Sequence, residues 1–273
     1  MLTRPIPRSG ESLPIVGLGT WQTFDAASNA ARRPLRDVLF EFVSFGGRVV
    51  DSSPMYGRSE SVAGDLATDL GIQKELFIAT KVWTSGRDAG IRQMDESFRR
   101  LRASRIDLMQ VHNLVDWQTH LQTLRAWKAQ GKIRYIGVTH YTESAYGELE
   151  RVIKNEELDF IQLNYSVAER GAERRMLPLA AERRLAVLVN RPLAEGGLFR
   201  KVRDRPLPEW AAESGAASWA QFFLKFVLGH PAVTCAIPAT SRVDHLRDNM
   251  SAGRGPLPDV ATRKRMADYV DNL

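Results

Sequence analysis

Three apolar runs in the first half of the chain each carry an ionisable residue of a kind that catalyses proton transfer. Asp51 follows "VV", Lys81 lies in "LFIATKVW", and His112 ends "IDLMQVH". Tyr56 lies shortly after Asp51 in a stretch of Ser, Pro and Gly, which is typical of a loop. If the runs are parallel strands of one sheet, their carboxyl ends meet at the same edge, where such sheets carry their active sites. The four side chains are then expected to form one cluster.

A specific proton-transfer chemistry follows from this cluster. A lysine inside an apolar strand needs a carboxylate, because burying an unpaired ammonium is costly, and Asp51 on the neighbouring strand supplies one. The ammonium of Lys81 favours the phenolate of Tyr56, so we expect it to lower the tyrosine pKa from about 10 towards neutral pH. A phenol tuned in this way is a usable proton donor. Taken singly, Asp51 could cap a helix and His112 could be structural, but their joint placement favours catalysis.

The elements that position these residues alternate regularly. Eight short runs rich in Val, Ile and Leu recur at intervals of 25 to 33 residues, except for a last interval of 48. Segments with helical periodicity fill the intervals, as between Leu35 and Val43, where a Gly-Gly pair follows. The pattern predicts one (β/α)8 (TIM) barrel domain over residues 1–273, with a short N-terminal extension and a C-terminal helix in residues 260–273. The predicted strands begin at Ile15, Arg48, Leu76, Ile106, Ile133, Leu158, Leu185 and Val233.

Two other folds have similar periods. A solenoid would repeat a side-chain signature in every unit, and these units share none, whereas strands that are apolar on both faces are typical of a parallel sheet. An open, doubly wound sheet usually has fewer strands and, for a dinucleotide, a G-x-G-x-x-G turn after the first strand. The segment "GLGTWQ" lacks the third glycine. In the longest interval, the Pro-rich and charged residues 199–218 are predicted to form a loop over the barrel mouth.

Composition limits the partners. The chain has 38 basic and 32 acidic residues and a net charge of +6, which suits a small anion as well as nucleic acid. Its basic clusters lie in helix-like segments without interleaved aromatic residues, so we expect no nucleic-acid partner. The single cysteine, Cys235, excludes an internal disulfide and is predicted to lie in the core. No signal peptide or membrane span is evident, and we expect a cytoplasmic protein, monomeric by default, with no bound metal.

The chain resembles the aldo-keto reductases from "GLGTW" in the first predicted strand to "LRDN" after the eighth. "VDSSPMYGRSE" is similar to the family's Asp and Tyr segment, "IATKVW" to its lysine strand and "DLMQVHN" to its histidine strand. By this resemblance, a nicotinamide cofactor gives hydride to an aldehyde or ketone, which is the small-molecule partner, while Tyr56 protonates the oxygen. Lys81 and Asp51 are then expected to tune Tyr56, and His112 to orient the carbonyl.

The resemblance also implies positions for the nicotinamide. "IGVTHY" is similar to a strand that usually ends in Ser-Asn, so Thr139 and His140 take the places that hold the carboxamide. Gln162 matches the family's carboxamide-binding glutamine. Where many members have an aromatic residue in Tyr-Ser-Pro-Leu, this chain has "NRPL", and Asn190 and Arg191 stand beside the nicotinamide instead.

The segment "IPATSRVDHLRDN" is similar to the family's site for the adenosine end of the cofactor. Thr240 and Ser241 open a helix, whose free N–H groups favour an anion. Arg242 adds a guanidinium, a good phosphate partner, so we expect NADPH to be preferred, with NADH possible. Asp248 and Asn249 match positions that contact adenine.

Three tryptophans, Trp21, Trp83 and Trp117, follow predicted strands and are candidates for the walls of an open substrate pocket, although each could equally pack at the barrel rim. Two alternatives to a reductase remain. One is a regulatory subunit that binds nicotinamide with little turnover, against which the complete set of four residues argues. The other is an aldolase with a Schiff base on Lys81, which is disfavoured because Asp51 keeps that lysine charged.

Overall fold

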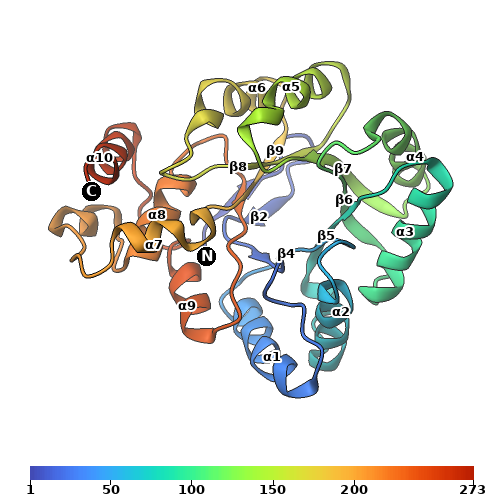
Figure 1. Cartoon of the computed structure of the whole chain (residues 1–273), viewed down its shortest axis with the longest axis horizontal. Coiled ribbons are helices and arrows are strands. Elements are labelled where there is room, and N and C mark those ends of the chain that lie inside the picture. Colours follow the sequence, from blue (N-terminus) through green and yellow to red (C-terminus); the bar gives the residue numbers. More distant parts are fainter.

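Eight parallel strands form a closed ring at the centre of the computed structural model, which describes residues 1–273, and helices surround the ring (Figure 1). The strands are hydrogen-bonded in chain order from β3 to β10. Two parallel bridges, between Val16 and Ala236 and between Gly19 and Ala239, join the first strand to the last. The predicted (β/α)8 barrel is therefore confirmed, and all eight predicted strands are present.

The bounds of the elements are as follows. The hairpin and barrel strands are β1 (Thr3–Pro5), β2 (Ser12–Pro14), β3 (Leu18–Gly19), β4 (Val49–Asp51), β5 (Phe77–Val82), β6 (Ile106–His112), β7 (Ile133–Thr139), β8 (Phe160–Asn164), β9 (Ala186–Asn190) and β10 (Cys235–Ala236). The helices are α1 (Asn29–Ser44), α2 (Ser59–Leu70), α3 (Arg87–Arg100), α4 (Trp117–Ala129), α5 (Tyr146–Asn155), α6 (Met176–Glu182), α7 (Gly197–Lys201), α8 (Trp219–Leu228), α9 (Val243–Ser251) and α10 (Val260–Asp271). Short 3-10 turns are η1 (Gln73–Glu75), η2 (Glu143–Ala145), η3 (Gly171–Arg174), η4 (Ala194–Gly196) and η5 (Glu209–Ser214).

The outer helices pack one apolar stripe against the strands. Helix α1 begins at the Ser28 cap, whose hydroxyl accepts the N–H of Ala31, and its buried side chains are Leu35, Val38, Leu39 and Phe42. Val43, predicted on the same face, is only partly buried. The terminal helix α10 is present as predicted and buries Met266 and Val270. No helix combines the length and hydropathy needed to cross a bilayer.

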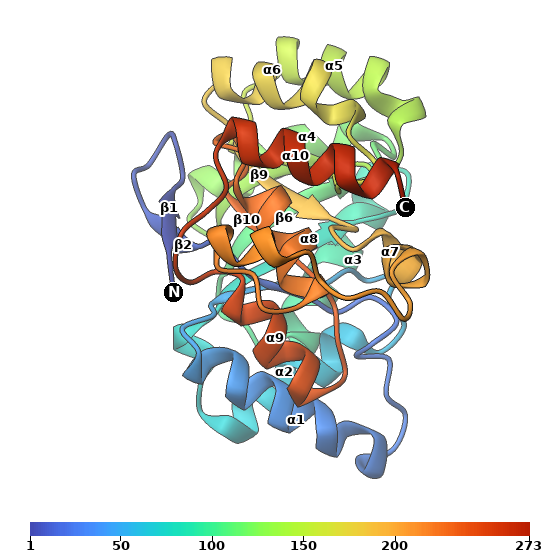
Figure 2. The same cartoon turned by 90° about the vertical axis from the view of Figure 1, so that its left-hand side faces the viewer.

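The amino-terminal end of the barrel is plugged. β1 and β2 form an antiparallel hairpin at this end, opposite α7, at the left and right of Figure 2 respectively. Ile6 and Leu13 of the hairpin region join a buried cluster inside the ring, which also contains Cys235 as predicted. The other members are Val49, Phe77, Ala79, Leu108, Tyr135, Phe160, Ala186, Leu188 and Ile237. Because these side chains fill this end, the barrel interior is accessible only from the carboxyl ends of the strands.

Residues 199–218 are more structured than predicted. The segment contains the end of α7 and the turn η5, and not one continuous loop. Phe199 on α7 lines the cavity at the carboxyl ends of the strands, so the segment does lie at the barrel mouth.

Candidate active site

The carboxyl ends of three adjacent strands bring together the predicted ionisable residues. Asp51 ends β4, Lys81 lies at the penultimate position of β5, and His112 ends β6. All three are buried, and a cavity of about 700 Å³ opens above them. Asp51, Tyr56 and His112 line this cavity, whereas Lys81, which is 0% exposed, lies beneath its floor.

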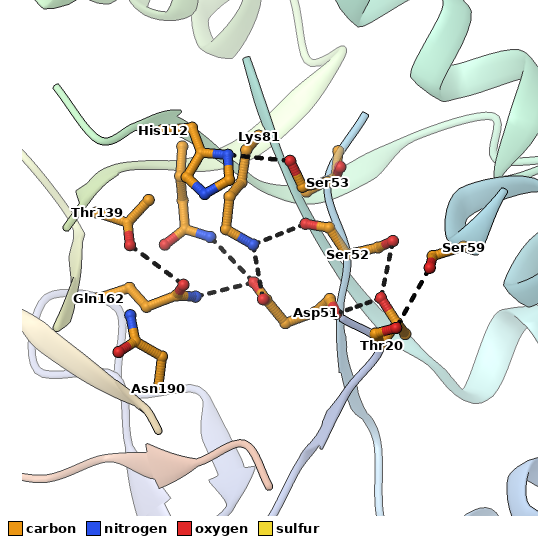
Figure 3. A network of polar contacts seen from close by, with 12 residues as sticks. Thr20, Asp51, Ser52, Ser53, Ser59, Lys81, His112, Thr139, Gln162 and Asn190 are labelled. Carbon is orange, nitrogen blue, oxygen red and sulfur yellow. Dashed lines mark hydrogen bonds and ion pairs between the residues drawn. The ribbon is translucent and has the colours of Figure 1, made fainter. Parts of the chain in front are cut away.

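Lys81 and Asp51 form a buried ion pair. The Lys81 ammonium donates to Oδ2 of Asp51 at 2.6 Å and to the carbonyl oxygen of Ser52 at 2.7 Å (Figure 3). Oδ1 of Asp51 accepts from the side-chain amides of Gln162 at 2.9 Å and Gln110 at 3.3 Å. Burial disfavours the ammonium, but Asp51 and Tyr56 outweigh it and raise the pKa of Lys81 above its ordinary value. The lysine is therefore charged at neutral pH, which argues against a nucleophilic amine and a Schiff base.

Tyr56 lies in the loop after β4. Its backbone is held by the next residues: Gly57 has φ of 61°, in the left-handed region, and the N–H of Arg58 donates to Asp25 at 3.0 Å. The ring packs edge-on against His112 with centroids 5.8 Å apart.

The expected lowering of the tyrosine pKa was wrong. Burial is the strongest influence on Tyr56 and raises its pKa, the Lys81 ammonium 5.0 Å from the ring centroid lowers it, and Asp51 raises it again. The net effect is an increase, because removing the phenolate from water costs more than one partly compensated ammonium returns. The phenol therefore keeps its proton, which is the state that a proton donor needs.

His112 is neutral. Burial and then the nearby charge of Lys81 lower its pKa to about 2. Nδ1 of the ring lies 3.0 Å from the hydroxyl of Ser53, a residue that the sequence did not single out. A neutral imidazole carries one N–H, so His112 can act as a hydrogen-bond donor without adding a second positive charge beside Lys81.

A second cavity of about 480 Å³ adjoins the first, and both are lined by Phe199 and Ala239. Four predicted nicotinamide positions line the first cavity: Thr139, Gln162, Asn190 and Arg191. Three predicted adenosine positions line the second: Thr240, Asp248 and Asn249. A dinucleotide is long and has two ring-bearing ends, so two joined cavities fit its shape. Oδ1 of Asn190 is buried without a protein partner, as expected of an acceptor for a ligand N–H.

Three predicted cofactor residues lie outside both linings. Nδ1 of His140 accepts the backbone N–H groups of Tyr141 and Thr142, so this ring folds over its own loop. Ser241 and Arg242 are exposed at the start of α9. The guanidinium of Arg242 forms an ion pair with Asp244. Its Nε donates to Oδ1 of Asp244 at 3.0 Å, and its Nη2 donates to Oδ2.

Two of the three predicted tryptophan walls line the cavity. Trp21 and Trp83 do so, with 41% and 42% of their surfaces exposed. The prediction for Trp117 is wrong: it is buried at the start of α4, and its indole N–H donates to Glu148 at 3.1 Å. Trp117 belongs to the buried face of α4 and packs in the main hydrophobic core.

Other residues of the site were not predicted. Met55, Tyr141 and Phe199 are exposed apolar side chains of the first cavity. His245, which lies in the segment matched to the adenosine site, lines the second cavity. Gln110 was also missed, although strand alternation places it on the same face of β6 as His112 and therefore beside Asp51.

The comparison with known families agrees with this geometry. Residues 15–264 match the model of the aldo/keto reductase family. The chain belongs to this family. This aldo-keto reductase is 29% identical over 257 residues to the methylglyoxal reductase YeaE of Escherichia coli K12, covering 91% of this chain and 89% of that one. It is 26% identical over 223 residues to an NADH-specific methylglyoxal reductase of the same strain, covering 70% and 67% of the two chains.

A solved structure supports the same assignment. An aldo-keto reductase from Klebsiella pneumoniae, solved in complex with NADPH, superimposes with a TM-score of 0.82 at 26% identity, covering 98% of this chain and 96% of that one. This aldo-keto reductase is an oxidoreductase that uses a nicotinamide cofactor to reduce aldehydes or ketones to alcohols.

Proposed function

We propose that the protein is an NADPH-dependent carbonyl reductase in which Tyr56 protonates the carbonyl oxygen. The observation that carries this assignment is the placement of a protonated phenol at the cavity. The centroid of its ring lies 5.0 Å from the Lys81 ammonium. When bound, NADPH supplies the hydride. Lys81 stabilises the phenolate that remains after proton transfer, and Asp51 keeps Lys81 charged. Neutral His112 donates a hydrogen bond that orients the carbonyl oxygen.

The cofactor assignment rests on the two joined cavities. Thr139, Gln162 and Asn190 are proposed to hold the carboxamide of the nicotinamide, and Asp248 and Asn249 the adenine. The other predicted cofactor positions are proposed to lie along the same path, namely His140, Arg191, Thr240, Ser241 and Arg242. Preference for NADPH over NADH rests on the exposed guanidinium of Arg242 and is consistent with the Klebsiella complex. The NADH-specific relative makes NADH the necessary comparison.

The substrates are proposed to be carbonyls with an apolar substituent. Five large apolar side chains exposed on the protein surface line the first cavity: Trp21, Met55, Trp83, Tyr141 and Phe199. Covering such a surface is favourable, so an aromatic or aliphatic aldehyde gains more binding free energy here than a small polar one. Methylglyoxal, the substrate in the names of the relatives, is the small polar comparison.

We also propose that residues 1–273 fold as one domain and that the protein is a cytoplasmic monomer.

The test follows NADPH consumption with aromatic aldehydes, aliphatic aldehydes and methylglyoxal. Tyr56→Phe removes the proposed proton donor and is expected to reduce kcat by about 100-fold or more. Tyr141→Phe is the matched control, because it deletes a phenol oxygen from the same cavity without touching the proposed chemistry. Equal losses in the two variants, or full activity in Tyr56→Phe, contradict the role of Tyr56. NADPH binding without carbonyl-dependent oxidation contradicts the proposed function.

A further inference from the structure

Ser53 is placed to control the proton of His112. It follows β4, is 0% exposed, and brings its hydroxyl oxygen to 3.0 Å from Nδ1 of the ring (Figure 3). The same oxygen accepts the backbone N–H of Met55 at 3.3 Å. A serine hydroxyl has one proton to give. With Met55 donating to the oxygen, the hydroxyl proton is free to point at Nδ1 of His112.

The other ring nitrogen, Nε2, is available to a ligand in the first cavity. His112 lines the first cavity, and its Nε2 has no hydrogen-bond partner in the protein but is not sealed from solvent. The ring is neutral, since burial lowers its pKa to about 2, so one nitrogen carries the proton and the other a lone pair. If Nδ1 accepts from Ser53, Nε2 must carry the proton.

We propose that Ser53 is a positioning residue that fixes His112 in the Nε2–H tautomer, so that this N–H donates to the substrate carbonyl oxygen. The inference rests on the proposed function and deepens it. In the opposite tautomer, the lone pair of Nε2 faces the lone pairs of the carbonyl oxygen, and the donor is lost. The hydrogen bond strengthens as negative charge develops on that oxygen, so Ser53 acts on the transition state through His112.

The experiment is an ¹⁵N spectrum of the full chain labelled at its five histidines, recorded at pH 7 and needing no substrate. The ring signals of His112 are assigned by their absence in His112→Asn. The wild type is expected to show the proton on Nε2. Ser53→Ala is expected to shift it partly or wholly to Nδ1, and Ser53→Thr to restore Nε2–H.

Ser52→Ala is the matched control, because it deletes the neighbouring buried hydroxyl, which contacts Thr20 and not His112. It is expected to leave the His112 signals in place. In carbonyl reduction, Ser53→Ala is expected to lower kcat by about 10-fold to 100-fold, the usual effect of losing one donor to a charged oxygen. Ser53→Thr is expected to recover most of that loss.

A proton on Nδ1 in the wild type overturns the inference, as does an unchanged tautomer in Ser53→Ala. The wild-type spectrum remains decisive even if Ser53→Ala fails to fold. Because the spectrum is independent of turnover, a correct tautomer without carbonyl reduction counts against the proposed function and not against the role of Ser53.

Discussion

Replacing Asp51 by asparagine separates the stability of the buried ion pair from its function. The variant leaves the Lys81 ammonium without its counter-charge, while the carbonyl of Ser52 still accepts from it at 2.7 Å. The lysine side chain is 0% exposed and that of Asp51 is 4% exposed, so water cannot replace the lost carboxylate. Removing one partner of a buried pair typically costs about 3–5 kcal/mol.

The Lys81 ammonium can avoid this cost by releasing its proton. The free energy of that deprotonation is therefore the upper limit of the stability loss in Asp51→Asn. Deprotonating a lysine of pKa about 10.4 at pH 7 requires about 4.6 kcal/mol, and at pH 9 only about 1.9 kcal/mol. The folded variant then binds fewer protons than its unfolded chain, so its stability rises with pH. The expected loss in Asp51→Asn is therefore about 3–4.6 kcal/mol at pH 7 and about 1.9 kcal/mol or less at pH 9.

Urea unfolding, followed by far-ultraviolet circular dichroism at both pH values, measures these losses. The double variant Asp51→Asn/Lys81→Met removes both charges, and is expected to regain most of the stability while remaining inactive, because Tyr56 then lacks its ammonium. A loss below about 1 kcal/mol at pH 7, or one of equal size at pH 9, refutes the reasoning. A double variant no more stable than the single one shows that the pair itself stabilises the fold.

Three further predictions concern other parts of the chain. Burial lowers the pKa of Lys225 to about 8 from an ordinary value of 10.5, so wild-type stability is expected to rise relative to Lys225→Met between those pH values in urea titrations. Trp83→Ala is expected to raise KM for aromatic aldehydes in steady-state assays, whereas Trp117→Ala leaves KM unchanged and lowers stability by about 3–5 kcal/mol in the same titrations. Asp244→Asn releases Arg242 and is expected to raise the NADPH to NADH ratio of kcat/KM by about 1.4-fold to fivefold, because an exposed ion pair is worth about 0.2–1 kcal/mol. An unchanged ratio excludes Arg242 from cofactor selection.

Strand order and the catalytic cluster could be predicted because both depend on the regular spacing of apolar runs along the chain. Apolar runs spaced by helical segments fix which residues end a strand, and parallel pairing then places Asp51 beside Lys81. The buried position of Cys235 followed from the same pattern. A residue that ends a strand is thus placed by its neighbours in sequence.

Side-chain direction beyond the ends of the strands could not be predicted, because it depends on contacts that are distant or competing. The sequence does not reveal that the ring of His140 accepts two N–H groups of its own loop, or that Trp117 turns towards Glu148 on α5. Ser53 lies in a stretch whose composition is typical of a loop, and its contact with His112 spans 59 positions of the chain. Such contacts arise only once the barrel has closed.

The pKa of Tyr56 is another property that depends on the closed fold and not on the sequence pattern, and it bears on catalysis. The sequence predicts the effect of one charge, Lys81, whereas the fold adds burial and the carboxylate of Asp51, which both oppose the phenolate. Lys81 is thus the one favourable influence on the anion, and Asp51 is the largest of the influences that keep it charged. The carboxylate has two opposing effects: it destabilises the phenolate directly and preserves the ammonium that stabilises it. Since the phenol is the stable form in the free protein, Tyr56 holds the proton that the proposed reduction delivers to the carbonyl oxygen.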